Sequence, residues 1–242
     1  MKSVAVIFGS LILGLTLASG LWLHAWENGR NSGANVLSVT GSVKKNVTAD
    51  LAKWTASFNR RATVENVKET LDQAAKDARD VKNFIAKYGI PESAITFLPL
   101  QTETLYEPNY GYSTKNVIGY LVRQEVRVEH ADIAKVEQLA QDVKKLIDQG
   151  IIPESQRTEY FYTKISDLRP ELFSAATKDA RERARAIAAG SGARIGRLRS
   201  ARTGVMQILA PNSTNFEDYG AYDTSTKEKE ILATVTVSFT LQ

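Results

Sequence analysis

The sequence predicts an α+β fold of two layers, with amphipathic helices packed on a mostly antiparallel sheet and an N-terminal transmembrane helix before it. Three observations predict this: strand-like and helix-like hydrophobic periods alternate, a motif recurs 102 residues downstream, and the first residues form a long uncharged run. With 242 residues, 43% hydrophobic and 24% charged, the chain can bury a sizeable core. We expect a membrane segment at 1–26, a linker at 27–35 and a folded body at 36–242.

The N-terminal segment has the length and polarity of a membrane span. Residues 3–26 carry no charged side chain, and these 24 residues exceed the ~20 that cross a bilayer as a helix. Lys2 precedes the run, which predicts a cytoplasmic N-terminus and an exported body, held at the membrane by a single pass. Ser10, Gly14 and Ala18 recur every fourth residue, a stripe on which two membrane helices could pack.

A cleaved signal peptide is the alternative interpretation of this segment. Lys2 would then form the positive region and 4–17 the apolar region, with cleavage after Ala18. Both interpretations send the body out of the cytoplasm, and the second releases it from the membrane.

The first half of the body reads as strands around one long helix. Strands are expected at 36–45 and 47–59, where Trp54 and Phe58 alternate with polar residues. Apolar residues at steps of three and four predict a helix over 64–88, which Gly89 and Pro91 end. Strands follow at 94–106 and 117–129.

The second half repeats these patterns. A helix is expected over 132–149, a strand over 157–166 and a helix over 170–189 with Pro170 at its start. Strands at 194–209 and 231–241 complete the chain. The buried stripe of the last helix consists of small residues, which allow close approach to a sheet: Ala176, Ala180, Ala184 and Ala188.

An internal repeat links the two halves. The Lys-Asp-Ala-Arg sequence at 76–79 recurs at 178–181, and the Tyr/Gly-rich stretch at 110–115 resembles that at 219–227. Each copy reads helix, strand, loop, strand, which predicts a duplication. We expect two like halves that share one sheet.

Two long loops, 106–116 and 211–230, carry tyrosines among Asn, Gly and Ser. Rigid rings with adaptable polar neighbours suit protein–protein contacts, although the rings of ordinary hairpin ends would lie back on the sheet. The candidate oligomer contacts are Tyr106, Tyr110, Tyr112, Phe216, Tyr219 and Tyr222.

The composition excludes several kinds of site. The chain has no Cys and two His, which excludes thiolate sites and argues against a His-rich metal site. No nucleotide-binding or hydrolase motif occurs, and the Gly-rich stretch at 190–196 ends a helix where a phosphate site would begin one. We expect no catalytic residue, cofactor, metal or identifiable small-molecule ligand; an enzyme that uses Ser, Thr, Tyr, Lys or carboxylate chemistry is the minority hypothesis.

Basic residues are concentrated between 181 and 202. The net charge of +4, from 31 basic and 27 acidic residues, does not indicate a nucleic-acid partner. The local cluster could nevertheless face anionic lipid, another polyanion or an acidic subunit, unless it is a solvated helix face. The candidate contacts are Arg181, Arg185 and Arg197.

The body resembles the bacterial SIMPL-domain family, which includes periplasmic immunogenic and oxidative-stress-associated members. The resemblance is carried by Val39-Thr40-Gly41, the helix of 64–88, Ala175 to Arg181, Ala184, Ile187-Ala188 and Ile195 to Leu198. It implies an α+β fold and, in at least one branch, ring-like oligomers that enclose a channel. It also implies an envelope location, which here means the bacterial inner membrane with the body in the periplasm or, after signal cleavage, the periplasm or outer membrane. It supplies no catalytic residues.

Two hypotheses follow for function. The first is a membrane-anchored envelope protein that self-assembles into a ring- or channel-like scaffold. Its partners would be further copies of itself and the lipid bilayer, which residues 3–26 would enter. The second is a soluble periplasmic stress-response or binding module released by signal-peptide cleavage.

Overall fold

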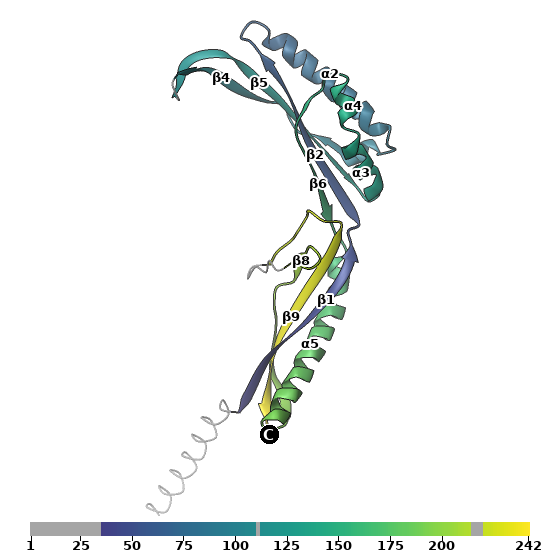
Figure 1. The fold of residues 1–242 in the computed structure, drawn as a ribbon, viewed down its shortest axis with the longest axis vertical. Helices are drawn as coiled ribbons and strands as arrows, with labels where there is room; N and C mark the ends of the chain where they lie inside the picture. Colours follow the sequence, from purple (N-terminus) through teal and green to yellow (C-terminus); the bar gives the residue numbers. More distant parts are fainter. Residues whose placement is uncertain (1–34, 110–111, 214–219) are drawn as a thin grey trace, which may run out of the picture. The chain divides into compact units, whose positions relative to one another are not determined.

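The computed structural model describes residues 35–109, 112–213 and 220–242 (Figure 1). In this part of the chain the fold is α+β, with two antiparallel sheets and four α-helices. The chain divides into two compact units: unit 1 contains 35–44, 169–206 and 232–242, and unit 2 contains 45–168 and 207–231, with the gaps given above. Each unit is described here by itself.

Unit 2 is built on a five-stranded sheet. Its strands are ordered β3-β5-β2-β6, and β4 also pairs with β5. Helices cover one face of this sheet (Figure 1). The elements are β2 (Leu51–Ala62), α2 (Val67–Ala86), β3 (Ile95–Phe97), β4 (Gln101–Asn109), β5 (Tyr112–His130), α3 (Ile133–Gln141), α4 (Lys144–Ile147) and β6 (Pro153–Phe161), with a 3-10 turn, η1, at Glu92–Ala94.

Large apolar side chains fill the core of unit 2. Trp54 is fully buried on β2, where its backbone neighbours are Val128 of β5 and Thr158 of β6. Its indole Nε1 donates to Gln156 Oε1 at 3.2 Å, so the buried ring keeps its hydrogen bond. The helices contribute Val81, Phe84, Ile85, Val136, Leu139 and Leu146 to the same core.

Unit 1 is built on a smaller sheet, ordered β1-β9-β7. The elements are β1 (Val36–Thr48), α5 (Ile165–Gly190), β7 (Ile195–Thr203) and β9 (Glu228–Leu241); β8 (Gln207–Leu209) also pairs with β9. Residues of β1, α5 and β9 belong to both units. Thr40 and Thr236 share a hydroxyl hydrogen bond of 2.8 Å, which marks the register between β1 and β9.

The helix of unit 1 lies very close to its sheet. The alanine stripe of α5 (Ala176, Ala180, Ala184 and Ala188) is buried as the sequence predicts. Gly41 of β1 faces this stripe, and a Cβ there would overlap the backbone of Ala176 and Ala180. Alanine and glycine are therefore required at this contact by the distance between the two backbones.

Most predicted elements are confirmed, but the prediction of one shared sheet is wrong. β1 pairs with β9, whereas β2, which follows after two residues, pairs with β5 and β6. The chain thus changes ladders at Ala49 and Asp50, and two sheets result. Alternation specifies which side of a strand is buried, and it does not specify the neighbouring strand.

Several predicted boundaries also need correction. The helix expected at 132–149 divides into α3 and α4, and Asp142 at the division accepts hydrogen bonds from Tyr88 and Lys145. The strand of 94–106 divides into β3 and β4, and that of 194–209 into β7 and β8. The strand expected at 157–166 spans 153–161, and α5 begins at Ile165, so Pro170 lies inside the helix instead of at its start.

The two sheets share a strand order that agrees with the predicted repeat. In unit 2, the elements β2, α2, β4 and β5 occur in this order along the chain, with η1 and β3 between α2 and β4. Their strands are ordered β2-β5-β4 in the sheet. The series β1, α5, β7 and β9 likewise gives β1-β9-β7. The duplication itself stays a prediction.

The predicted transmembrane segment, including Ser10, Gly14 and Ala18, lies outside the described residues. Among the residues that are described, no helix is long and apolar enough to cross a membrane.

Candidate functional site

The distal half of the β4–β5 hairpin forms a two-stranded ribbon. The pairing of β2 with β5 ends at Ala62 and Tyr120, and beyond that point β5 continues with β4 as its paired strand. Gly119 marks the division, because a Cβ at this position would overlap the carbonyl oxygen of Ala62. Figure 1 shows this part of the hairpin extending past the helices of unit 2. We call residues 104–109 and 112–119 the ribbon.

The ribbon exposes apolar groups. Tyr106 is 46% exposed and Ile118 is 48% exposed. An isolated two-stranded hairpin is at best marginally stable in water, and exposed strand edges are ready templates for pairing with another chain. These features make the ribbon a candidate protein–protein contact.

The predicted aromatic contacts have different environments. Tyr106 is exposed, but it lies within β4, and the prediction of a loop over 106–116 is wrong because β4 continues to Asn109 and β5 begins at Tyr112. Tyr222 is 44% exposed, but its hydroxyl accepts from the amide of Tyr162 at 2.8 Å and its ring lies 5.9 Å from that of Phe161. Tyr222 thus holds its own loop against the end of β6. Tyr110, Phe216, Tyr219 and the side chain of Tyr112 lie outside the described residues.

An apolar pocket lies between α2 and the sheet of unit 2. Its cavity volume is about 20 Å³, roughly the room that one water molecule needs. Its lining includes the apolar residues Phe58, Val81, Val122 and Ile151, and Arg60 and Asp77 flank it.

Arg60 and Asp77 form a paired group at this pocket. Arg60 donates two hydrogen bonds to Asp77, one of them from a terminal guanidinium nitrogen to Oδ1 at 3.0 Å. Gln73 Nε2 also donates to Asp77 Oδ1 at 3.0 Å. These bonds raise the pKa of Arg60 above its ordinary value. The pair ties α2 to β2, and its charges already satisfy each other.

The sequence predictions missed this pair, although a signal was present. Asp77 falls between Ala74 and Val81 on the apolar stripe of α2, where a carboxylate would be costly without a partner. The same position in the second Lys-Asp-Ala-Arg copy is Asp179, which accepts from the amide of Ser42 at 2.8 Å. Both aspartates of the repeated motif therefore tie a helix to the strand beneath it.

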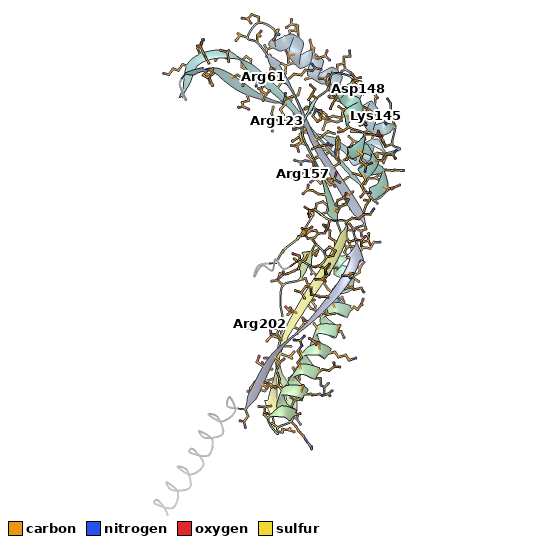
Figure 2. All side chains as sticks on the ribbon, viewed as in Figure 1. Arg61, Arg123, Lys145, Asp148, Arg157 and Arg202 are labelled. Carbon is orange, nitrogen blue, oxygen red and sulfur yellow. The ribbon has the colours of Figure 1, made fainter. Side chains whose placement is uncertain are left out.

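On the face of the sheet opposite the helices, charged side chains connect β5, close to the start of the ribbon, to β6. Arg123 of β5 donates to both carboxylate oxygens of Glu154, at 2.7 and 2.8 Å. This bidentate bond lowers the pKa of Glu154 below its usual range. Arg123 and Arg157 point away from the helices in Figure 2, so this face of the sheet is polar.

A buried lysine organises the loop before β9. The side chain of Lys229 is fully buried, and its Nζ donates to the carbonyl oxygen of Asp223 at 2.6 Å. Burial lowers the pKa of Lys229, against the opposing effect of the Asp223 carboxylate. The alternating sequence gave no sign of this buried charge, because strand position alone does not reveal a partner six residues away.

The candidate basic contacts lie in unit 1 and are all exposed. Arg181 and Arg185 belong to α5, and Arg197 belongs to β7. The intervening Arg183 pairs with Asp179 at 2.8 Å. The three candidates therefore stand on two elements of the same unit.

The described residues contain no group of three or more His, Asp or Glu side chains that could hold a metal ion. His130 accepts from the amide of Asp132 at 3.0 Å, and Asp132 in turn caps α3. This histidine has a structural role at a helix start.

Comparison with protein families gives a match over residues 37–240 to SIMPL, described as a protein of unknown function (DUF541). The chain belongs to the SIMPL family. The match covers residues from both units of the SIMPL domain. No curated protein matches the chain.

Three solved structures are each similar to about half of this chain. A de novo designed protein, Foldit4, is 14% identical with a TM-score of 0.25, over 45% of this chain and 94% of that one. A protein of unknown function from Galdieria sulphuraria is 16% identical with a TM-score of 0.25, over 47% and 52%. An amidase of the hydantoinase/carbamoylase family from Burkholderia ambifaria is 15% identical with a TM-score of 0.26, over 48% and 29%.

Proposed function

We propose that this protein is a membrane-anchored component of the cell envelope that self-assembles into an oligomeric scaffold, ring- or channel-like in form, with its body in the periplasm. The uncharged run of residues 3–26 supports the anchor and the export of the body. The role is structural and not enzymatic. We also propose that the body arose by duplication of a helix-strand-loop-strand unit.

The ribbon is the observation that carries the self-assembly proposal. It exposes Tyr106 and Ile118 on strands that lack helix cover, and a second copy would bury these groups. Burying such apolar area stabilises association by roughly 25 cal/mol per Å² before the costs of ordering are subtracted. Tyr222 contributes indirectly, by fixing its loop.

The mass of the gently detergent-extracted full chain tests this proposal. We expect an oligomer at micromolar concentration, and a monomer would contradict it. The paired change Tyr106→Asp and Ile118→Asp should lower the oligomeric mass, because two carboxylates would have to be desolvated in the contact.

A matched control uses two other exposed apolar residues of unit 2. Val64 is 49% exposed and Ile147 is 47% exposed. The pair Val64→Asp and Ile147→Asp should leave the mass unchanged, and circular dichroism should show that both double variants are folded. Equal loss of mass in the two variants would argue against the ribbon as the contact.

A periplasmic binding module, released by signal-peptide cleavage, is the second candidate function. The N-terminal segment favours it as well, since Lys2, the apolar residues 4–17 and Ala18 have the order of a signal peptide and its cleavage point. Amino-terminal sequencing of the protein from its own membrane separates the two. A mature start near Ser19 supports release, and an intact Met1 or Lys2 supports the anchor.

A further inference from the structure

The two units differ strongly in charge. Among the described residues, unit 1 has ten Lys or Arg against three Asp or Glu, whereas unit 2 has nineteen against twenty-one. A net of +7 on the smaller unit is a marked asymmetry within a chain whose total is only +4. Such asymmetry indicates an anionic partner for one part of a molecule.

Several basic residues of unit 1 gather at one end of it. The amide of Leu241 donates to Asn35, and Arg194 and Gln242 exchange two backbone hydrogen bonds of 2.8 Å. The start of β1, the end of β9 and the start of β7 are therefore adjacent, and α5 ends there too (Figure 1). We call the exposed residues Arg185, Ile187, Arg194, Arg197 and Leu198 the basic end.

The basic end also exposes large apolar side chains. Ile187 is 52% exposed and Leu198 is 55% exposed. A nucleic-acid backbone would pair with the arginines and leave Ile187 and Leu198 in water. Arginines beside exposed aliphatic groups are typical of surfaces that lie on a membrane, where guanidinium groups bind phosphates and apolar groups enter the interface.

The chain path brings this end to a bilayer. Asn35 lies at the basic end, and residues 27–34 separate it from the uncharged run. Eight residues reach at most ~30 Å when extended. If residues 3–26 lie in the membrane, which is the anchoring part of the proposed function, the basic end stays within that distance of the lipid headgroups.

We infer that the basic end of unit 1 binds the anionic phospholipid surface of the membrane that anchors the chain. The arginines recognise headgroup phosphates, and Ile187 and Leu198 enter the headgroup layer. Arg202 lies farther along β7, on the face of the sheet that α5 does not cover (Figure 2). It is therefore not part of this contact.

A fluorescence experiment on the full chain tests this inference. The chain has no cysteine, so one introduced at the exposed Ala189 of α5 can carry an environment-sensitive dye, and one at the exposed Ser93 serves as the reference in unit 2. Each labelled chain is reconstituted in nanodiscs of phosphatidylcholine alone or of an equal mixture with phosphatidylglycerol. We expect the label at 189 to shift to the blue in the anionic discs only, and high salt to reduce the shift.

Charge variants locate the contact. Arg185→Gln with Arg194→Gln and Arg197→Gln should abolish the shift, since each basic residue near an anionic surface strengthens binding about fivefold. The control, Arg169→Gln with Lys178→Gln and Arg202→Gln, removes the same charge from exposed positions elsewhere in unit 1 and should keep the shift.

The outcomes separate this inference from the anchoring proposal. A chain that enters neither disc overturns the anchor on which the inference rests. A chain that enters both discs with the same label response, or with equal effects of the two triple variants, overturns the inference alone. A shift that a soluble polyanion produces equally in neutral discs assigns the basic end to polyanions and not to lipid.

Discussion

Unit 1 and unit 2 each place a helix on an antiparallel sheet, but they use different side chains to do so. In unit 1 the buried stripe of α5 is alanine, and it faces Gly41 at close backbone distance. In unit 2 the helices bring Val81, Phe84 and Ile85 against Trp54 and other large groups. The helix–sheet interface of unit 1 depends on close approach of the two backbones, whereas that of unit 2 depends on large side chains that fill the space between helix and sheet.

This difference has an energetic consequence. An alanine stripe removes little apolar area per residue from water, so α5 depends more on the fit of its backbone and on polar ties such as that from Ser42 to Asp179. The core of unit 2 buries large side chains, and it is therefore more sensitive to loss of volume. Substitutions that enlarge or shrink a side chain should act differently in the two units.

Trp54→Ala should have the largest effect on folding. The side chain is fully buried, and its removal leaves a cavity and an unpaired Gln156, at a cost of about 3–5 kcal/mol in the free energy of unfolding. Urea denaturation measures the loss, and hydrogen exchange should place it in peptides of unit 2. Trp54→Phe, which keeps most of the side-chain volume, is the control and should cost less. A loss below about 1 kcal/mol for the alanine variant would contradict the inference that filled volume is the main source of stability in this core.

Gly41→Ala should destabilise unit 1 although it adds a single methyl group. The new Cβ overlaps backbone atoms of α5, which cannot move without shifting the helix, so we expect a cost of about 1–3 kcal/mol. Gly190→Ala is the matched control, because a Cβ there meets no atom within 4 Å and alanine favours the helix by up to ~1 kcal/mol. Hydrogen exchange in β1 and α5 measures the stability of both variants. Equal effects of the two substitutions would show that the close approach of α5 to β1 does not contribute to stability.

The two aspartates of the repeated motif allow a direct comparison of units. Asp77→Asn should cost about 1–3 kcal/mol, since the side chain is only 11% exposed and Arg60 would lose its charged acceptor. Asp179→Asn should cost about 1 kcal/mol or less, because its side chain is 31% exposed. Thermal unfolding of the two variants gives the order, and the reverse order would mean that the tie in unit 1 is the stronger one.

Asp179 also predicts an acid dependence for unit 1. The hydrogen bond from Ser42, with that from Arg183, lowers the pKa of Asp179. Its folded-state value thus lies below the ~3.9 of an unfolded chain, so its contribution is present above that pH and is lost as the pH falls toward the folded value. The Asn variant should remove this part of the acid dependence from hydrogen exchange in α5.

Tyr88→Phe should have the smallest effect at neutral pH and a distinct effect in alkali. Burial and the hydrogen bond to Asp142 raise the pKa of Tyr88 to about 12. Because an unfolded tyrosine titrates near ~10, the contribution of Tyr88 is present below that pH and is lost as the pH rises toward the folded value. Urea denaturation across this range should show a shallower alkaline loss in the variant, and an unchanged slope would contradict the assignment to Tyr88. The described residues of unit 1 contain no tyrosine, so this loss belongs to unit 2.

The sequence by itself determined the local periods and the faces that they bury. The alternation from Leu51 to Phe58, the alanine stripe of α5 and the Val and Thr alternation of β9 all follow from side chains a few residues apart, and the structure confirms them.

Only the tertiary structure decided which strands are neighbours and which charges are paired. β1 and β9 lie almost two hundred residues apart, as the bond between Thr40 and Thr236 shows, and no local pattern selects that pairing over one with β2. The partners of Asp77 and Lys229 were hidden for the same reason. Periodicity fixes the direction of a side chain from its own segment, whereas a ladder or an ion pair requires two segments to meet, and the packing of the whole unit selects them.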